Sequence, residues 1–336
     1  MKRRLPLAVV LLALVLGPAA CGEKSEDVSG EPQPLSLTLD FYPNPDHAGI
    51  YMAEELGYFE DAGLDVTIRT PSDPAAPIKL LAAGRTDLAI SYEPEVVLAA
   101  EQGLDVVAVA ALVDQPLTSM IWLRKSGIGG IADLRGKTIA TAGIPYQDAY
   151  LRTILARSGL TPSDVRTVNV GFGLLPALAS GRAGAMLGGF RNVEGVDLRL
   201  RSLDPVVTPV DRLGVPSYDE LVLVARRDRL EEDPEEIRLF IAALARGTAA
   251  AVERPNEALA ALLEANPDLE PKLTRAEVAA TLPLLDSGAS ERPYGYMDPT
   301  RWRRFVAWMR DNGLIDSLPA PSSLLSNDYL AGTIPE

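Results

Sequence analysis

Short apolar runs alternate with amphipathic stretches along the chain from residue 35 onward. Runs such as Leu35–Asp40 have the length and side-chain types of strands, whereas Ala48–Tyr58 repeats its apolar residues at helical spacing. This alternation predicts an α/β architecture with mostly parallel sheets. The expected strands are 35–40, 64–69, 87–91, 106–112, 137–140, 165–170 and 185–187, and the expected helices are 48–58, 75–83, 95–101, 148–157 and 174–180.

One part of this pattern occurs twice. Segments 80–90 and 177–187 both read as the end of a helix, a glycine that caps it, and a strand. The first expected strand of each half is offset by a similar distance along the chain. The repetition predicts two lobes of related topology.

The C-terminal third changes to longer helical stretches, at 234–251, 256–263, 275–284 and 300–312. Asp233 followed by Pro234 is typical of a helix start, with Asp as the N-cap and Pro in the first turn. We expect these helices to pack on the first lobe and the apolar strand 220–225 to return the chain to it. The expected lobes are therefore 35–117 plus 217–330 and 118–216, with crossings near 116–119 and 215–218.

The first residues have the pattern of an export signal. Three basic residues, Lys2, Arg3 and Arg4, precede an apolar run that is too short to span a bilayer as a permanent helix. We expect residues 1–20 to be removed as a signal peptide. Residues 21–34 are rich in Glu, Ser, Gly and Pro, which predicts a flexible tether.

Cys21 is the only cysteine in the chain and directly follows Ala19 and Ala20. This position predicts a lipidated cysteine that anchors the protein to the outer face of the bacterial cell membrane. An ordinary signal peptide followed by a free thiol is the alternative, since Pro18 stands three residues before the cysteine, where lipoproteins generally carry Leu. A single cysteine allows no intramolecular disulfide, so stability must come from core burial.

The charge of the chain limits its partners. The formal net charge is −14, and removing Lys2, Arg3 and Arg4 makes it −17. Such an acidic protein is not expected to bind nucleic acid or to lie on anionic lipid through a basic patch. Membrane attachment is therefore expected through the lipid alone.

Ligands of open parallel sheets bind beyond the carboxyl ends of the strands. Here those ends carry aromatic rings for stacking, amide and carboxylate groups for hydrogen bonding, and glycines that let backbone approach a ligand. The alternative for each single residue is an ordinary turn position. The residues that we expect to contact a small planar polar ligand are Tyr42, Asn44, His47, Asp73, Tyr92, Glu93, Gly143, Phe172, Phe190, Asn192 and Glu194.

The sequence carries no pattern typical of a metal site or an enzyme. His47 is the only histidine, and metal sites usually draw several ligands from His and Cys. We find no G-x-S-x-G elbow, P-loop, dinucleotide-binding glycine motif or H-E-x-x-H. We therefore expect neither a metal nor a cofactor, and we do not expect an enzyme.

A fairly specific motif runs from Leu39 to Tyr51, with Pro-Asn, His, Gly and Tyr at fixed spacing. Matching runs follow at 57–66, 72–74, 91–94 and 133–137. Together they resemble the pyrimidine-precursor-binding proteins of thiamine-salvage ABC importers, over Leu35 to about Leu285. The resemblance implies a type II periplasmic-binding-protein fold of two lobes that close over the ligand, a permease as partner and a monomeric state.

The resemblance also implies roles for individual residues. Asn44 and Glu194 stand where the family holds its aminopyrimidine. Phe190 stands where the family commonly has Tyr, so a hydroxyl is absent and the identity of the ligand is open. Relatives of the same fold bind riboflavin, sulfonates, taurine or nitrate, and an anion would require a basic group such as Arg191 or Arg124. A related enzyme, hydroxymethylpyrimidine phosphate synthase, carries a cysteine-rich motif that this chain lacks.

Overall fold

The computed structural model describes residues 32–285 and 292–331, and these residues form one compact unit. The predicted signal peptide and Cys21 lie outside the described residues. The ordered chain begins earlier than the predicted tether allows, because β1 (Gln33–Thr38) starts at Gln33 and Gln33 N–H donates to Gly63 O. Pro34 is tolerated there because this end of the strand has β2 as its only partner.

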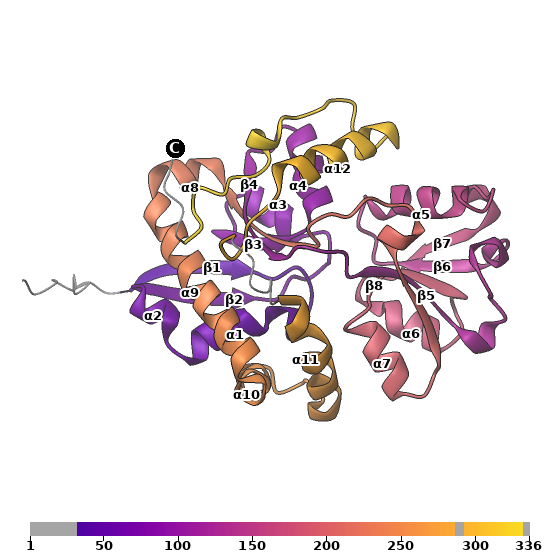
Figure 1. The fold of residues 1–336 in the computed structure, drawn as a ribbon, viewed down its shortest axis with the longest axis horizontal. Helices are drawn as coiled ribbons and strands as arrows, with labels where there is room; N and C mark the ends of the chain where they lie inside the picture. Colours follow the sequence, from indigo (N-terminus) through magenta and orange to yellow (C-terminus); the bar gives the residue numbers. More distant parts are fainter. Residues whose placement is uncertain (1–31, 286–291, 332–336) are drawn as a thin grey trace, which may run out of the picture. The chain divides into compact units, whose positions relative to one another are not determined.

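The first sheet has the strand order β2-β1-β3-β10-β4. Its strands are β1, β2 (Leu64–Arg69), β3 (Leu88–Ser91), β4 (Val106–Val113) and β10 (Leu221–Arg226). β1 pairs in parallel with β2 and β3, whereas β10 runs antiparallel to β3 and β4. We call this sheet and the helices packed on it lobe one (Figure 1).

The second sheet has the order β7-β6-β8-β5-β9. Its strands are β5 (Thr118–Leu123), β6 (Thr138–Thr141), β7 (Arg166–Asn169), β8 (Ala185–Phe190) and β9 (Pro205–Pro209). β6 pairs in parallel with β7 and β8, and β5 runs antiparallel to β8 and β9. We call this sheet and its helices lobe two. In each sheet the strand that breaks the parallel order occupies the same position, next to β3 in one and next to β8 in the other.

The α/β prediction and the repeated topology are thus confirmed, but the prediction of mostly parallel sheets is wrong. Half of the strand pairs in the described residues are antiparallel. The reason is that β5 and β10 are the first strands after the chain has passed from one sheet to the other. The chain leaves the first sheet after Val113 and returns to it at Leu221.

The helices cover both sheets. Lobe one carries η1 (Pro45–His47), α1 (Ala48–Glu55), α2 (Tyr58–Asp61), α3 (Pro77–Ala82), α4 (Glu93–Glu101), α8 (Arg227–Glu232), α9 (Pro234–Glu253), α10 (Pro255–Ala265), α11 (Pro271–Leu285), α12 (Pro299–Asp311) and η7 (Pro321–Ser323). Lobe two carries η3 (Ile131–Leu134), α5 (Gln147–Ala156), η4 (Pro162–Asp164), η5 (Gly171–Gly173), α6 (Leu174–Ala179), α7 (Glu194–Leu200) and η6 (Val210–Leu213), and η2 (Arg124–Ser126) follows β5. No described helix is both long and apolar enough to cross a membrane.

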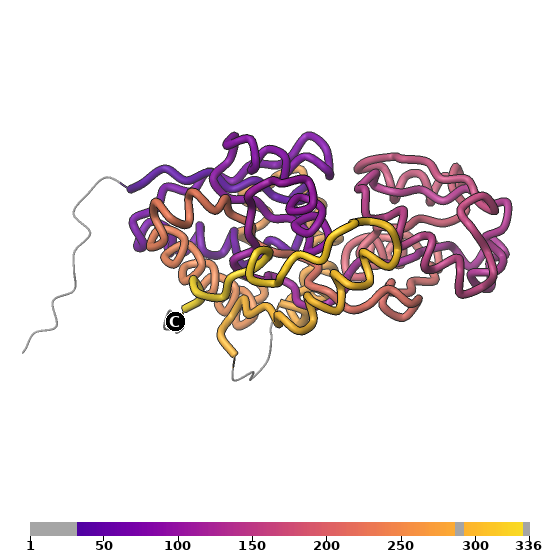
Figure 2. The backbone as a smooth tube through the Cα atoms, turned by 90° about the horizontal axis from the view of Figure 1, so that it is seen from above, coloured from indigo at the N-terminus to yellow at the C-terminus, as the bar shows by residue number. Residues whose placement is uncertain are grey.

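The C-terminal helices pack on lobe one, as the sequence predicts. α9 lies along α1 (Figure 1). Their backbones approach closely because Gly49 and Gly247 face each other. A Cβ at Gly247 would stand 2.2 Å from Gly49 O. α12 and the segment after it lie beside α4, where Glu101 accepts a hydrogen bond from Asp316 N–H (Figure 2). These contacts join the last third of the chain to the core of lobe one.

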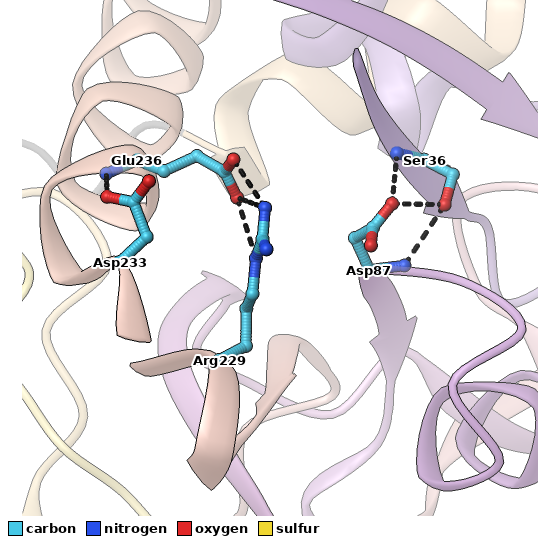
Figure 3. A network of polar contacts seen from close by, with 5 residues as sticks. All are labelled: Ser36, Asp87, Arg229, Asp233 and Glu236. Carbon is cyan, nitrogen blue, oxygen red and sulfur yellow. Dashed lines mark hydrogen bonds and ion pairs between the residues drawn. The ribbon is translucent and has the colours of Figure 1, made fainter. Parts of the chain in front are cut away.

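Two separate polar networks stabilise the start of α9 and the contact between β1 and β3 (Figure 3). Asp87 accepts hydrogen bonds from the backbone N–H and hydroxyl of Ser36, which ties β1 to the start of β3. The Arg229 guanidinium contacts both carboxylate oxygens of Glu236, and Asp233 accepts from Glu236 N–H at 3.1 Å as the predicted N-cap.

The N-cap gives a first prediction. Asp233→Ala is expected to lower the free energy of unfolding by about 1 kcal/mol, because a free N–H in the first turn of α9 loses its acceptor. Urea denaturation measures the change. The control is Glu232→Ala, an exposed residue at the end of α8. Equal stability of the two variants would show that Asp233 does not cap the helix.

Candidate functional site

A cleft is lined by residues from both lobes. Its walls come from the carboxyl ends of strands, where the sequence predicts a site. Lobe one contributes Phe41, Asn44 and Tyr92, and Thr118 begins β5. Lobe two contributes Ala142, Ile144, Tyr146, Gln147, Gly188, Phe190, Val193 and Glu194. We call this space the cleft.

Glu194 is the only carboxylate among the lining residues, and it is held by both lobes. It is the first residue of α7, and Phe190 N–H donates to its carboxylate at 2.7 Å. From lobe one, the Tyr42 hydroxyl donates to Glu194 at 3.3 Å. Burial raises the pKa of Glu194, while these hydrogen bonds oppose the shift. Burial also raises the pKa of Tyr42 well above its ordinary value, so this hydroxyl remains a donor at neutral pH.

Aromatic rings form two groups at the cleft. Tyr92 and Tyr146 meet edge to face with ring centroids 5.8 Å apart, and both line the cleft. Phe41, Tyr42 and Phe172 form a second group, in which the rings of Phe41 and Phe172 lie 4.6 Å apart. Phe172 comes from lobe two, so this group contacts both lobes near Glu194. Such rings offer faces on which a planar ligand can stack.

The glycine positions are explained by close approaches. Gly188 has φ +113°, and a Cβ there would stand 2.4 Å from Gln147 Nε2. Gln147 Oε1 in turn accepts from Ala142 N–H at 3.0 Å, which fixes the amide in the cleft wall. Gly143 has φ +78°, and a Cβ there would stand 2.2 Å from Asn169 Nδ2. Gly143 itself does not line the cleft, although its neighbours Ala142 and Ile144 do.

Asn44 lines the cleft, but its amide also shapes the loop before α1. Its Oδ1 accepts from Asp46 N–H at 2.9 Å, and its Nδ2 donates to Tyr42 O at 3.0 Å. Asn44 N–H donates to His47 Nδ1 at 3.3 Å, which leaves His47 Nε2 as the donor to Asp40 at 2.8 Å. Asp40 also accepts from the Tyr92 hydroxyl at 2.8 Å. The fully buried His47 therefore supports the cleft wall from behind.

Three other predicted site residues do not line the cleft. Asp73 is exposed and caps the turn before α3 by accepting from Ala75 N–H at 2.8 Å. Glu93 is fully buried and accepts from Asp219 N–H at 2.7 Å, and burial followed by the nearby Asp219 raises its pKa well above the ordinary value. Asn192 is buried and contacts lobe one instead of the cleft.

Asn192 belongs to a contact between the lobes. Its Nδ2 donates to Asp46 of η1 at 2.7 Å and to the Thr281 hydroxyl of α11 at 2.9 Å. Asp46 Oδ2 and Asn192 Oδ1 are buried without a hydrogen-bond partner among the described residues. Glu277, one turn before Thr281 on α11, faces Glu194 and Asp197 of α7. We call Asp46, Glu194, Asp197 and Glu277 the acidic seam.

A second hollow lies in lobe one. It is lined by Asp114, Arg301, Tyr296 and other residues of 111–112, 284–285 and 292–298. None of the predicted ligand contacts reaches it. It draws no residue from lobe two, so closure of the lobes would not cover it.

The sequence analysis missed several lining residues. Tyr146 and Gln147 follow β6 and could have been found by the same strand-end rule, but they lie just before the helix expected at 148–157 and were not selected. Thr118 was missed because β5 carries no alternating pattern and is buried throughout. Within the described residues, no group of three or more His, Cys, Asp or Glu side chains could hold a metal ion.

The chain is similar in sequence to several known proteins. The family model described as NMT1/THI5 like matches residues 44–258. A thiamine biosynthesis protein of Haemophilus influenzae is 36% identical, with 88% of this chain and 90% of that one covered. The formylaminopyrimidine-binding protein of Halalkalibacterium halodurans is 35% identical, with 90% and 92% covered.

More distant matches include an enzyme and a solved binding protein. A 4-amino-5-hydroxymethyl-2-methylpyrimidine phosphate synthase of Legionella pneumophila is 27% identical, with 74% of this chain and 79% of that one covered. The structure of the alkanesulfonate-binding protein of Xanthomonas axonopodis superposes with a TM-score of 0.68 at 17% identity, with 89% and 99% covered. This last likeness establishes the periplasmic-binding-protein fold.

Proposed function

Because the chain belongs to the NMT1/THI5-like family, we propose that it is the substrate-binding component of an ABC importer and captures an aminopyrimidine in the cleft. The named binding protein that is 35% identical over most of both chains supports this role. An ABC permease is then the partner, and a monomer is the form that delivers the ligand. No enzymatic step is part of the proposal.

The chemistry of the cleft wall is the observation that carries the proposal. The lining residues offer aromatic rings, the amides of Asn44 and Gln147, and the carboxylate of Glu194, and none of them is basic. A carboxylate surrounded by rings suits a planar heterocycle with N–H donors. We propose that Glu194 accepts the exocyclic amino group and that the ring stacks on Phe190 or Tyr146.

The location follows from the same proposal. Residues 1–20 direct export, Cys21 carries the lipid, and the tether holds lobe one at 35–117 plus 217–330 and lobe two at 118–216 on the outer face of the membrane. The lobes close about the crossings near 116–119 and 215–218, which buries the ligand. Of the predicted contacts outside the wall, Tyr42 and Phe172 act through the aromatic group beside Glu194.

Anion binding is the main alternative within the same fold. Sulfonate, taurine and nitrate would need a basic group or a helix N-terminus at the ligand. Arg191 is occupied by Gln115 Oε1 and Pro116 O, and Arg124 is exposed and paired with Asp204. Neither lines the cleft. The N-termini of α5 and α7 do reach it, but the Glu194 carboxylate occupies the start of α7, so the wall favours an aminopyrimidine over an anion.

A panel of ligands tests the proposed function. The chain without residues 1–21 is titrated calorimetrically with 4-amino-2-methylpyrimidine, riboflavin, taurine, an alkanesulfonate and nitrate, and its melting temperature is measured with each. We expect only the aminopyrimidine to bind and to raise the melting temperature, because a ligand of the folded state stabilises it by mass action. Binding of an anion or of riboflavin in its place would overturn the proposed ligand.

A further inference from the structure

We propose that the cleft takes its ligand as a cation, so that a weakly basic heterocycle binds with uptake of a proton. This inference rests on the function proposed above and goes beyond it by stating the charge of the bound ligand. It concerns the balance of charge around Glu194, which none of the relatives' names describes.

The wall of the cleft is suited to a cationic ring. Tyr92, Tyr146, Phe41 and Phe190 present π-systems, and Glu194 is the one ionisable group that is not a phenol. Aromatic faces attract cations, and the attraction grows when water is excluded. A neutral ring would gain stacking and the hydrogen bond from its amino group, whereas a protonated ring would gain an ion pair with Glu194 as well.

Behind Glu194 lie the other carboxyl groups of the seam. Glu277 of α11, Asp197 of α7 and Asp46 of η1 are all buried. Burial and then the charges of Glu194, Asp197 and Asp46 raise the pKa of Glu277 to about 8. Burial also raises the pKa of Asp46 well above its ordinary value, and Asp46 Oδ2 accepts no hydrogen bond from the described residues.

The basic groups on the elements around the seam do little to offset the negative charge of Glu194. On α7, Arg201 pairs with Asp197, but its side chain is 55% exposed, and Arg199 is exposed. On α11, Lys272 and Arg275 are exposed in the first turns. On η1, His47 is held by Asp40, which is itself acidic. None of these basic groups pairs with Glu194, so its carboxylate is left to pair with a positive ligand.

This balance predicts a linkage between binding and protons. In this proposal Phe190 N–H and the Tyr42 hydroxyl hold Glu194 as a carboxylate in the free protein. A weakly basic aminopyrimidine that is largely neutral in water at neutral pH then takes its proton from solvent on entering the cleft. Above the pKa of the free ligand, affinity should then fall by about tenfold for each pH unit. In the Glu194→Gln variant this dependence should disappear, because the partner of the proton is gone.

Isothermal titration calorimetry measures how many protons are taken up when the ligand binds. The chain without residues 1–21 is titrated with 4-amino-2-methylpyrimidine at one pH in buffers of different ionisation enthalpy. We expect uptake of about one proton per ligand in the wild type and in Glu277→Gln, and almost none in Glu194→Gln. Glu277→Gln is the matched control, since it removes a carboxylate of the seam that does not line the cleft.

A second ligand keeps the test valid if Glu194→Gln fails to bind. Replacing the 2-methyl group by trifluoromethyl lowers the basicity of the ring at nearly constant shape. We expect this analogue to bind the wild type at least about tenfold more weakly at pH 7. Three results would each contradict binding of the ligand as a cation while leaving aminopyrimidine binding intact. They are zero proton uptake by the wild type, uptake that is lost in Glu277→Gln but kept in Glu194→Gln, and equal affinity for both ligands. If no aminopyrimidine binds at all, the proposed function fails and the cation with it.

Discussion

Glu220→Ala is expected to lower the free energy of unfolding by about 3 kcal/mol or more. Glu220 is fully buried where β10 begins and accepts from Leu117 N–H and Thr118 N–H at 2.7 Å and from the Thr118 hydroxyl at 2.8 Å. The Tyr218 hydroxyl donates to it as well, at 2.9 Å. One side chain thus joins both segments that pass between the sheets. Without it, several buried donors lose their acceptor.

Urea denaturation of the chain without residues 1–21 measures this loss. The control is Glu231→Ala, which removes an exposed carboxylate of α8 and should change stability by less than about 0.5 kcal/mol. If Glu220→Ala costs less than about 1 kcal/mol, the hydrogen bonds of Glu220 at the crossings do not stabilise the fold as their burial implies.

Glu194→Ala is expected to weaken aminopyrimidine binding by about 100-fold. Removing one partner of a buried, charged hydrogen bond typically costs 2–5 kcal/mol, and about 1.4 kcal/mol corresponds to tenfold in affinity. The variant also leaves Phe190 N–H and the Tyr42 hydroxyl without their acceptor. Calorimetric titration gives the dissociation constants, and Asp148→Ala, an exposed carboxylate on α5, is the control. A change of less than about threefold would exclude Glu194 as a ligand contact.

Much of the fold could be predicted from the sequence because its elements are strongly patterned. The strands at 35–40, 64–69 and 106–112 and the long C-terminal helices lie where periodicity places them, within a few residues. β9 was missed because two prolines bound a run of only a few apolar residues. β5 was missed because a strand buried on both faces shows no alternation.

The direction of strand pairing could not be predicted in the same way. β10 reads as an apolar strand that returns the chain to lobe one, and this is correct. Its insertion between β3 and β4 depends on contacts between residues more than one hundred positions apart. Local pattern carries no information about such contacts, so the antiparallel neighbours appear only in the structure.

The candidate site was predicted to the level of loops and not of side chains. The strand-end rule found Asn44, Tyr92, Phe190 and Glu194, which all line the cleft. The same rule selected Glu93, whose side chain accepts from Asp219 N–H, and Asn192, whose side chain donates to Asp46 of η1. Position in a loop does not determine which way a side chain points, and a buried polar group satisfies whichever neighbour folding brings to it.

Crystals of the chain without residues 1–21, grown with 4-amino-2-methylpyrimidine, test the central claim most directly. We predict electron density for a planar ring in the cleft, against Phe190 or Tyr146, with its amino group within hydrogen-bonding distance of Glu194. Density for the ring in the hollow beside Asp114 and Arg301, or an empty cleft at a ligand concentration that saturates binding in solution, would contradict the claim.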